Sequence, residues 1–185
     1  MTSEEIFSNV SARLIGALMV HDQMADYYDF LSLRGYKRCH EYHYKKESAM
    51  YRKLHRWYIN RYNKLIPEQK IDNPDILNIE MWNRYGRQGV KADYKEQAVK
   101  TGIGNWVKWE ADTMEMLSGY IKALQEIGDM SASHFLEKCL CDVERELKYA
   151  QRKEIELASI DYDLIFILQE QQRIHDKYLR KIKCI

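Results

Sequence analysis

Apolar residues recur along most of the chain at the spacing that places them on one face of an α-helix. In the first such segment this face includes Leu14, Leu18 and Leu31, and Thr2 with Glu5 has the form of a capping box that begins the helix. The spacing predicts bundle helices at about 3–34, 36–65, 105–127 and 132–158, and a further helix at about 161–183.

The connections between these segments differ in length. Gly35 is expected to end the first helix, because glycine readily takes the left-handed conformation of a helix terminus. In the stretch "GDMSAS" we expect Ser131 or Ser133 to cap the fourth helix. Residues 66–104 contain both prolines and are too long for a hairpin turn, so they are predicted to form a long crossover with one or two short helices.

These elements predict an all-α fold in a single domain, residues 1–185: an antiparallel four-helix bundle with a long crossover between helices 2 and 3 and an additional C-terminal helix. No stretch approaches the roughly 18 apolar residues of a membrane span. The acidic N-terminus "MTSEEIFSNV" is unlike a signal peptide, so we expect a cytoplasmic protein without a membrane partner. The cysteines, which form no CxxC pair, are expected to be reduced.

The net charge of +1 does not select a partner, but the basic residues are unevenly spread. The second helix combines them with aromatic residues, a pattern that can hold nucleic acid through phosphate contacts and base stacking. The candidate nucleic-acid contacts on the second and the C-terminal helices are Arg52, Lys53, Arg56, Lys177, Arg180 and Lys181. The near-neutral net charge argues against a dedicated nucleic-acid-binding protein. Such aromatic residues more often form core or subunit contacts.

Several stretches resemble ferritin-like proteins. "EIGDMSASHFLEKCLCDVERELKYA", residues 126–150, is similar to the join between the third and fourth helices of Dps-type mini-ferritins, and "DYYDFLSLRGYKRCHE", residues 26–41, is similar to their first turn. "WVKWEADT", residues 106–113, resembles the start of a ferritin third helix. The resemblance implies a ferritin-like fold, a homo-oligomer and a di-iron centre that oxidises and stores Fe(II). Another divalent metal, or none, stays open.

The ligand motifs of these families are not intact in this chain. Ferritins carry Glu-x-x-His on the second helix, whereas Glu47 is followed at this spacing by Met50. The acidic pair of the Dps type would fall near His55 and Ile59. Two interpretations therefore stay open: a non-standard metal site with ferroxidase-like chemistry, or a binding module that contacts nucleic acid or a protein partner without catalysis. No nucleophile triad, phosphate loop or dinucleotide motif suggests another enzyme class.

Carboxylates and imidazoles that project into the bundle centre are the candidate ligands, because such groups are costly to bury unpaired. Glu110 interrupts an apolar line and aligns with the ferritin third-helix glutamate, and Glu144 aligns with the ligand position on the fourth helix. The candidate metal ligands are Glu110, Glu144, Glu47, His43, Asp22 and Asp26, with His21 at nearly the same height. The structural alternatives are core histidines, solvated carboxylates, and an ion pair of Glu110 with Arg or Lys.

Overall fold

The protein is built from long helices. A computed structural model describes residues 1–67, 71 and 92–182. The helices are α1 (Ser3–Phe30), α2 (Arg34–Tyr62), α4 (Ala92–Glu126), α5 (Met130–Ala158) and α6 (Leu164–Ile182), and the described residues form no strand. The predicted all-α helical bundle with an additional C-terminal helix is therefore confirmed. No helix in the described part of the chain is long and apolar enough to cross a membrane.

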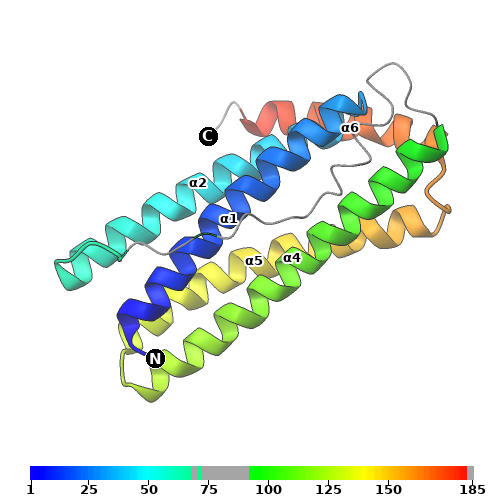
Figure 1. Ribbon diagram of the computed structural model, residues 1–185. Helices are drawn as coiled ribbons and strands as arrows, with labels where there is room; N and C mark the ends of the chain where they lie inside the picture. The colour runs from blue at the N-terminus through cyan, green and yellow to red at the C-terminus, as the bar shows by residue number, and fades with distance from the viewer. Residues whose placement is uncertain (68–70, 72–91, 183–185) are drawn as a thin grey trace.

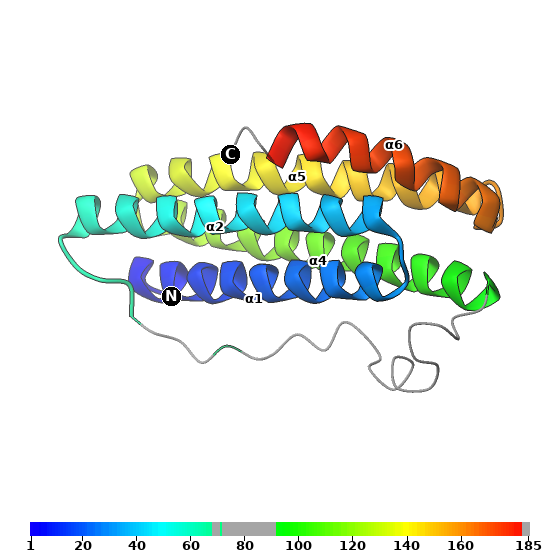
Figure 2. The same ribbon diagram turned by 90° about the horizontal axis from the view of Figure 1, so that it is seen from above.

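The helices pack as two antiparallel pairs, α1 with α2 and α4 with α5 (Figure 1). The helices α2 and α4, which belong to different pairs, run in the same direction (Figure 2). The predicted crossover was too long at its C-terminal side, since α4 already begins at Ala92. The short helices predicted within the crossover lie outside the described residues, and so does Cys184.

The helix termini confirm one sequence prediction and correct two. The Thr2 side chain accepts from the Glu5 N–H at 3.2 Å, and the Glu5 carboxylate accepts from the Thr2 N–H at 2.8 Å, so the capping box is present. The prediction that Gly35 ends α1 was wrong, because Ser32 takes the left-handed conformation (φ 61°). The N-cap of α5 is Asp129, whose carboxylate accepts from the Ala132 N–H, instead of either serine.

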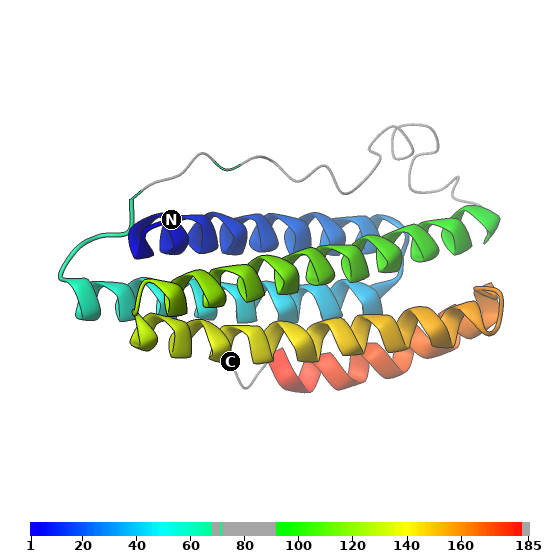
Figure 3. The same cartoon turned by 90° about the horizontal axis from the view of Figure 1, so that it is seen from below.

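Gly35 has a different role, which is to let α6 approach α2. A Cβ atom at this position would lie 1.8 Å from the backbone carbonyl oxygen of Gln171 in α6. Beside it, the Tyr36 hydroxyl donates to the buried Glu170 carboxylate at 3.0 Å, and Lys153 of α5 donates to the same carboxylate. These hydrogen bonds link α6 to α2 and to α5. The helix α6 packs mainly on α2 and also lies alongside α5 (Figure 3).

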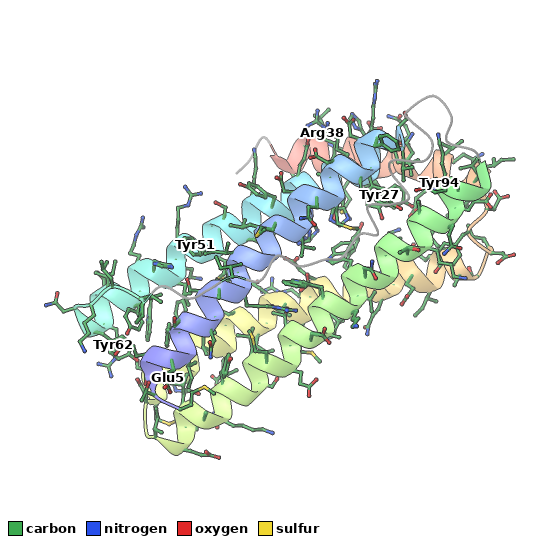
Figure 4. All side chains as sticks on the ribbon, viewed as in Figure 1. Glu5, Tyr27, Arg38, Tyr51, Tyr62 and Tyr94 are labelled. Carbon is green, nitrogen blue, oxygen red and sulfur yellow. The ribbon has the colours of Figure 1, made fainter. Side chains whose placement is uncertain are left out.

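The core is divided along the bundle axis into two apolar clusters. One lies toward the end marked by Glu5 and Tyr62 in Figure 4, and the other toward the end marked by Tyr27 and Tyr94. The first includes Ile6, Leu54, Leu124 and Leu136, and the second includes Met24, Tyr28, Ile103 and Leu157. Between them, each of the four bundle helices contributes at least one buried ionisable side chain: His21, His43, Glu110 and Glu146. Because burying charge costs several kcal/mol per ion, this layer is the candidate functional site.

Candidate metal centre

The centre of the polar layer is the carboxylate of Glu146 on α5, of which only 5% is exposed. Its Oε2 accepts from Nδ1 of His43 on α2 at 2.7 Å, and its Oε1 accepts from the ammonium of Lys46 one turn further along α2. Burial disfavours the charged form of Glu146, but His43 and Lys46 outweigh it and hold the pKa of the carboxyl well below its ordinary value. Burial likewise opposes a charge on His43, yet Glu146 raises its pKa to about 10.

Two further imidazoles adjoin this ion pair. His21 of α1 and His40 of α2 share a hydrogen bond between their Nδ1 atoms at 3.0 Å, which requires the accepting ring to be neutral with no proton on its Nδ1. Burial, followed by the charge of His43, lowers the pKa of His21 to about 3. His21 is therefore neutral at physiological pH, the state in which imidazole binds metals.

The outer nitrogens of two of these rings are left without partners. Within the described part of the chain, the buried Nε2 atoms of His21 and His43 have no hydrogen-bond partner of ordinary geometry, although the Cys39 thiol interacts with the His43 ring and helps to raise its pKa. Buried polar atoms are satisfied in most proteins, so each exception calls for an explanation. Ligand atoms of His21, His43 and Glu146 all lie within 4.8 Å of one another, close enough to share one metal ion.

Glu47 of α2 and Glu110 of α4 add two more carboxylates to the same layer. Glu110 is 5% exposed, and its Oε1 accepts from the indole N–H of Trp106 at 3.2 Å. Burial and the nearby charge of Glu146 raise the pKa of both Glu47 and Glu110. Neither carboxyl has enough positive charge around it to offset desolvation, which is the situation that a bound cation would relieve.

A small cavity of about 40 Å³ adjoins these two carboxylates. At ~10–15 Å³ for each water molecule, it has room for a few waters or an ion with part of its hydration. Arg13 of α1 lines this cavity and bridges the gap to α4: its Nε donates to Oγ1 of Thr113 and its Nη2 to the carbonyl of Trp109, each at 2.8 Å. Its guanidinium lies 3.4 Å from the centre of the Trp109 ring.

The structure brings together three of the predicted ligands and separates the other three. Glu110, Glu47 and His43 lie in the polar layer. Glu144 lies outside it, with a side chain that is 44% exposed and 4.0 Å from Lys148. Asp22 and Asp26 are exposed on α1. These three residues are therefore left out of the ligand set proposed below.

The central residue, Glu146, was not among the predicted ligands. It lies two positions after Glu144, and two residues turn a helix by roughly 200°, so only one of the pair can face the core. The signal was present in the sequence, because Glu146 lies seven positions after Cys139 and four before Ala150, both of which are buried on the same face. His21, which was noted only for its height, is the other histidine of the group.

The candidate nucleic-acid contacts are all exposed. Those on α6 lie close to aromatic rings: the ammonium of Lys177 is 4.6 Å from the ring centre of Tyr149, and that of Lys181 is 5.3 Å from that of Tyr42. The role of these six residues in binding nucleic acid stays a prediction.

The solved structures that are similar to this chain include archaeal ferritins. A humanized archaeal ferritin superposes with a TM-score of 0.78 at 15% sequence identity, over 95% of this chain and 97% of that one. An open-pore ferritin from the hyperthermophilic archaeon Archaeoglobus fulgidus gives 0.76 at 13% identity, over 94% and 95% of the two chains. A closed form of the latter, engineered by site-directed mutagenesis, gives 0.76 at 12% identity, over 95% and 96%.

No protein-family model and no curated protein matches the sequence. At these identities the structural likeness shows that the chain has the ferritin fold. The closeness to the Dps type stays a prediction.

Proposed function

We propose that this chain binds divalent transition-metal ions, with Fe(II) as the first candidate, in the polar layer at the centre of its bundle. The observation that carries the proposal is the grouping of His21, His43 and Glu146, whose ligand atoms lie within 4.8 Å of one another, together with buried Nε2 atoms on both histidines that have no ordinary hydrogen-bond partner among the described residues. Two imidazoles and one carboxylate form a donor set that suits Fe(II), once the metal has displaced the proton that His43 holds at its raised pKa.

The other two carboxylates extend the donor set. Glu47 and Glu110 adjoin the cavity and carry raised pKa values, so a divalent cation there would deprotonate them and offset their desolvation. Carboxylates from several helices facing one another in a bundle core support a second ion, and hence a di-metal site. Iron held by these groups would supply one-electron oxidation chemistry, and the surrounding apolar clusters would limit the access of water.

We further propose that the oxidised iron is stored by a homo-oligomer of this chain in the cytoplasm. Two observations support this. The structural neighbours carry the name ferritin, and the sequence resembles ferritin-like proteins in both helical hairpins. The reaction would then be that of a ferroxidase, with Fe(II) as substrate and stored cargo.

One observation favours the metal-free alternative. Glu146 already has two cationic partners from the protein itself, His43 and Lys46, so this carboxylate is electrostatically satisfied without a metal. In that case the polar layer would be a structural remnant, and the bundle would serve as a binding module.

Metal analysis of protein loaded anaerobically with Fe(II), and the absorption spectrum of its Co(II) form, decide between the two. We expect stoichiometric metal in the wild type and in Glu144→Gln, and its loss in Glu146→Gln, because only the second substitution changes the buried carboxylate. Circular dichroism verifies that both variants are folded. A wild type without stoichiometric metal, or equal metal content in the two variants, would overturn the proposal in favour of the binding module.

A further inference from the structure

A second feature of the molecule lies away from the polar layer, where the C-terminal half of α2 meets the first turns of α5. It is a surface hollow of about 460 Å³, within the range of roughly 300 to 1,000 Å³ that is typical of ligand sites. The residues that line it are Lys53, Arg56, Trp57, Asn60, Ser131, His134, Phe135 and Lys138. Neither the ferritin fold nor the proposed metal centre accounts for this combination.

The charge of the hollow has one sign. Lys53 and Arg56 project from α2 and Lys138 from α5, and none of these exposed cations forms an ion pair with a residue that the structure describes. The nearest acidic groups do not line the hollow: Glu137 is hydrogen-bonded to the ring of His134 at 3.0 Å, and Asp129 accepts from Tyr62 at 2.5 Å. Like charges gathered without counter-charges repel one another, and a polyanion would relieve that repulsion.

The floor of the hollow is aromatic. Trp57 and Phe135 are stacked with ring centroids 4.6 Å apart and an interplanar angle of 22°. Phe135 is 6% exposed, whereas Trp57 is partly exposed. This pair is held in place from within the bundle by Phe7, whose ring centroid is 5.1 Å from that of Trp57. A rigid aromatic surface offers a flat ring a place to pack at little entropic cost.

Hydrogen-bonding side chains complete the lining. Asn60 and His134 are exposed, and Ser131 lies in the first turn of α5. A bare inorganic anion would not use the aromatic floor, and a neutral aromatic molecule would not use the cations. The lining therefore fits a molecule that carries several negative charges beside a flat ring with polar edges.

We propose that this hollow binds a nucleotide, with its phosphates on Lys53, Arg56 and Lys138 and its base against Trp57 and Phe135. The source of that chemistry is either a free nucleotide or a unit of a single-stranded nucleic acid. The site is separate from the polar layer, so binding there does not depend on the metal proposal.

Isothermal titration of the full chain with ATP in metal-free buffer tests this inference. We expect saturable binding of one ATP per chain. Either Arg56→Gln or Lys138→Gln should weaken it about tenfold, the usual consequence of losing a hydrogen bond between charged groups. Lys45→Gln is the matched control, because Lys45 is exposed on the same helix as Arg56 but does not line the hollow. Its affinity should be close to that of the wild type.

Two further ligands test the aromatic contact and the source. Tripolyphosphate should bind more weakly than ATP, because it lacks the base. A single-stranded oligonucleotide that competes with ATP and binds more tightly identifies nucleic acid as the source, whereas one that binds no more tightly identifies the free nucleotide. The proposal is overturned by the absence of saturable ATP binding, by equal losses in Lys45→Gln and Arg56→Gln, or by equal affinity for tripolyphosphate and ATP.

Discussion

Lys46 and Glu146 form an ion pair that reaches from the surface into the centre of the bundle. The Lys46 side chain is 32% exposed, whereas that of Glu146 is only 6% exposed. The aliphatic part of the lysine thus passes through the helix interface and delivers its ammonium to a buried carboxylate. The ammonium occupies an oxygen of the same group that is proposed to bind metal, so a protein cation and a metal cation compete for one ligand.

This competition predicts that removal of the ammonium tightens metal binding. We expect Lys46→Gln to lower the dissociation constant for Co(II) or Fe(II) by about tenfold, equivalent to ~1.4 kcal/mol, because the repulsion between the two cations disappears. Competition with a chromophoric chelator measures the constant. Lys45→Gln removes an exposed charge from the neighbouring position and should leave it unchanged. An unaltered or weaker affinity in Lys46→Gln would show that the ion pair does not obstruct the metal.

From the raised pKa of Glu110 we expect the stability of the metal-free protein to depend on pH. Burial, followed by the charge of Glu146, raises the pKa of Glu110 from 4.5 to about 8. A carboxyl with a raised folded-state pKa contributes stability that is complete below pH 4.5 and is lost as the pH rises through 8. Glu110→Gln has no such loss, so its free energy of unfolding should exceed that of the wild type by about 1–3 kcal/mol at the upper end of this range.

The measurement is the difference in denaturant midpoint between Glu110→Gln and the wild type across this interval. A difference is needed because His21, whose pKa is lowered to about 3, changes stability in the opposite direction below its ordinary value of 6.5. The exposed Glu115 on the same helix provides the control variant Glu115→Gln. A difference that stays constant with pH would mean that Glu110 is ionised in the folded protein at neutral pH.

The helical framework could be predicted because it depends on local patterns. A few neighbouring residues are enough to determine each of these patterns: the periodic spacing of apolar residues, the capping box at Thr2 and the turn at Gly128. The burial of Glu110 could also be predicted, since this acidic residue interrupts the apolar line of its helix. These signals need no knowledge of what lies opposite in space.

The features of the site and of the helix packing that could not be predicted depend on contacts between segments that are distant along the chain. Glu144 and Glu146 are both close to the apolar stripe of α5, and the choice between them requires the rotation of the helix, which is set by its packing against α4. The ion pair of Glu146 with Lys46 joins residues a hundred positions apart. From its neighbours in the sequence, Gly35 was interpreted as a helix terminus. In the structure, glycine is required at this position because the backbone of α6 passes too close for a side chain.

A single methyl group added at Gly35 is accordingly expected to have a large effect on stability. Gly35→Ala should destabilise the protein by roughly 1–3 kcal/mol, because the new Cβ overlaps with the carbonyl of Gln171 and α6 must move away. Gly119→Ala, on an exposed part of α4 about two turns before its end and with no atom within 4 Å of the new Cβ, should stabilise it by ~0.5–1 kcal/mol through helix propensity. Chemical denaturation measures both. A Gly35→Ala variant as stable as Gly119→Ala would contradict the close approach of α2 and α6.

From the position and charge of Arg13 we expect an effect on the rate of metal uptake. Its guanidinium is fixed over Trp109, lines the cavity that adjoins Glu47 and Glu110, and opposes an approaching divalent cation by its charge. Arg13→Gln should therefore accelerate the association of Co(II) several-fold, and the difference should shrink as added salt screens the charge. Stopped-flow recording of tryptophan fluorescence follows the reaction, since Trp109 and Trp106 lie at the site.

The variant Arg52→Gln removes the same charge from an exposed position on α2 and should leave the association rate unchanged. Arg13→Gln should also cost about 0.5–1 kcal/mol of stability from the lost contact between the cation and the Trp109 ring, so the rates are compared where both variants are fully folded. An equal rate in Arg13→Gln and the wild type would mean that metal reaches the carboxylates by another route. Equal acceleration in the two variants would assign the effect to the overall charge of the protein instead of to the position of Arg13.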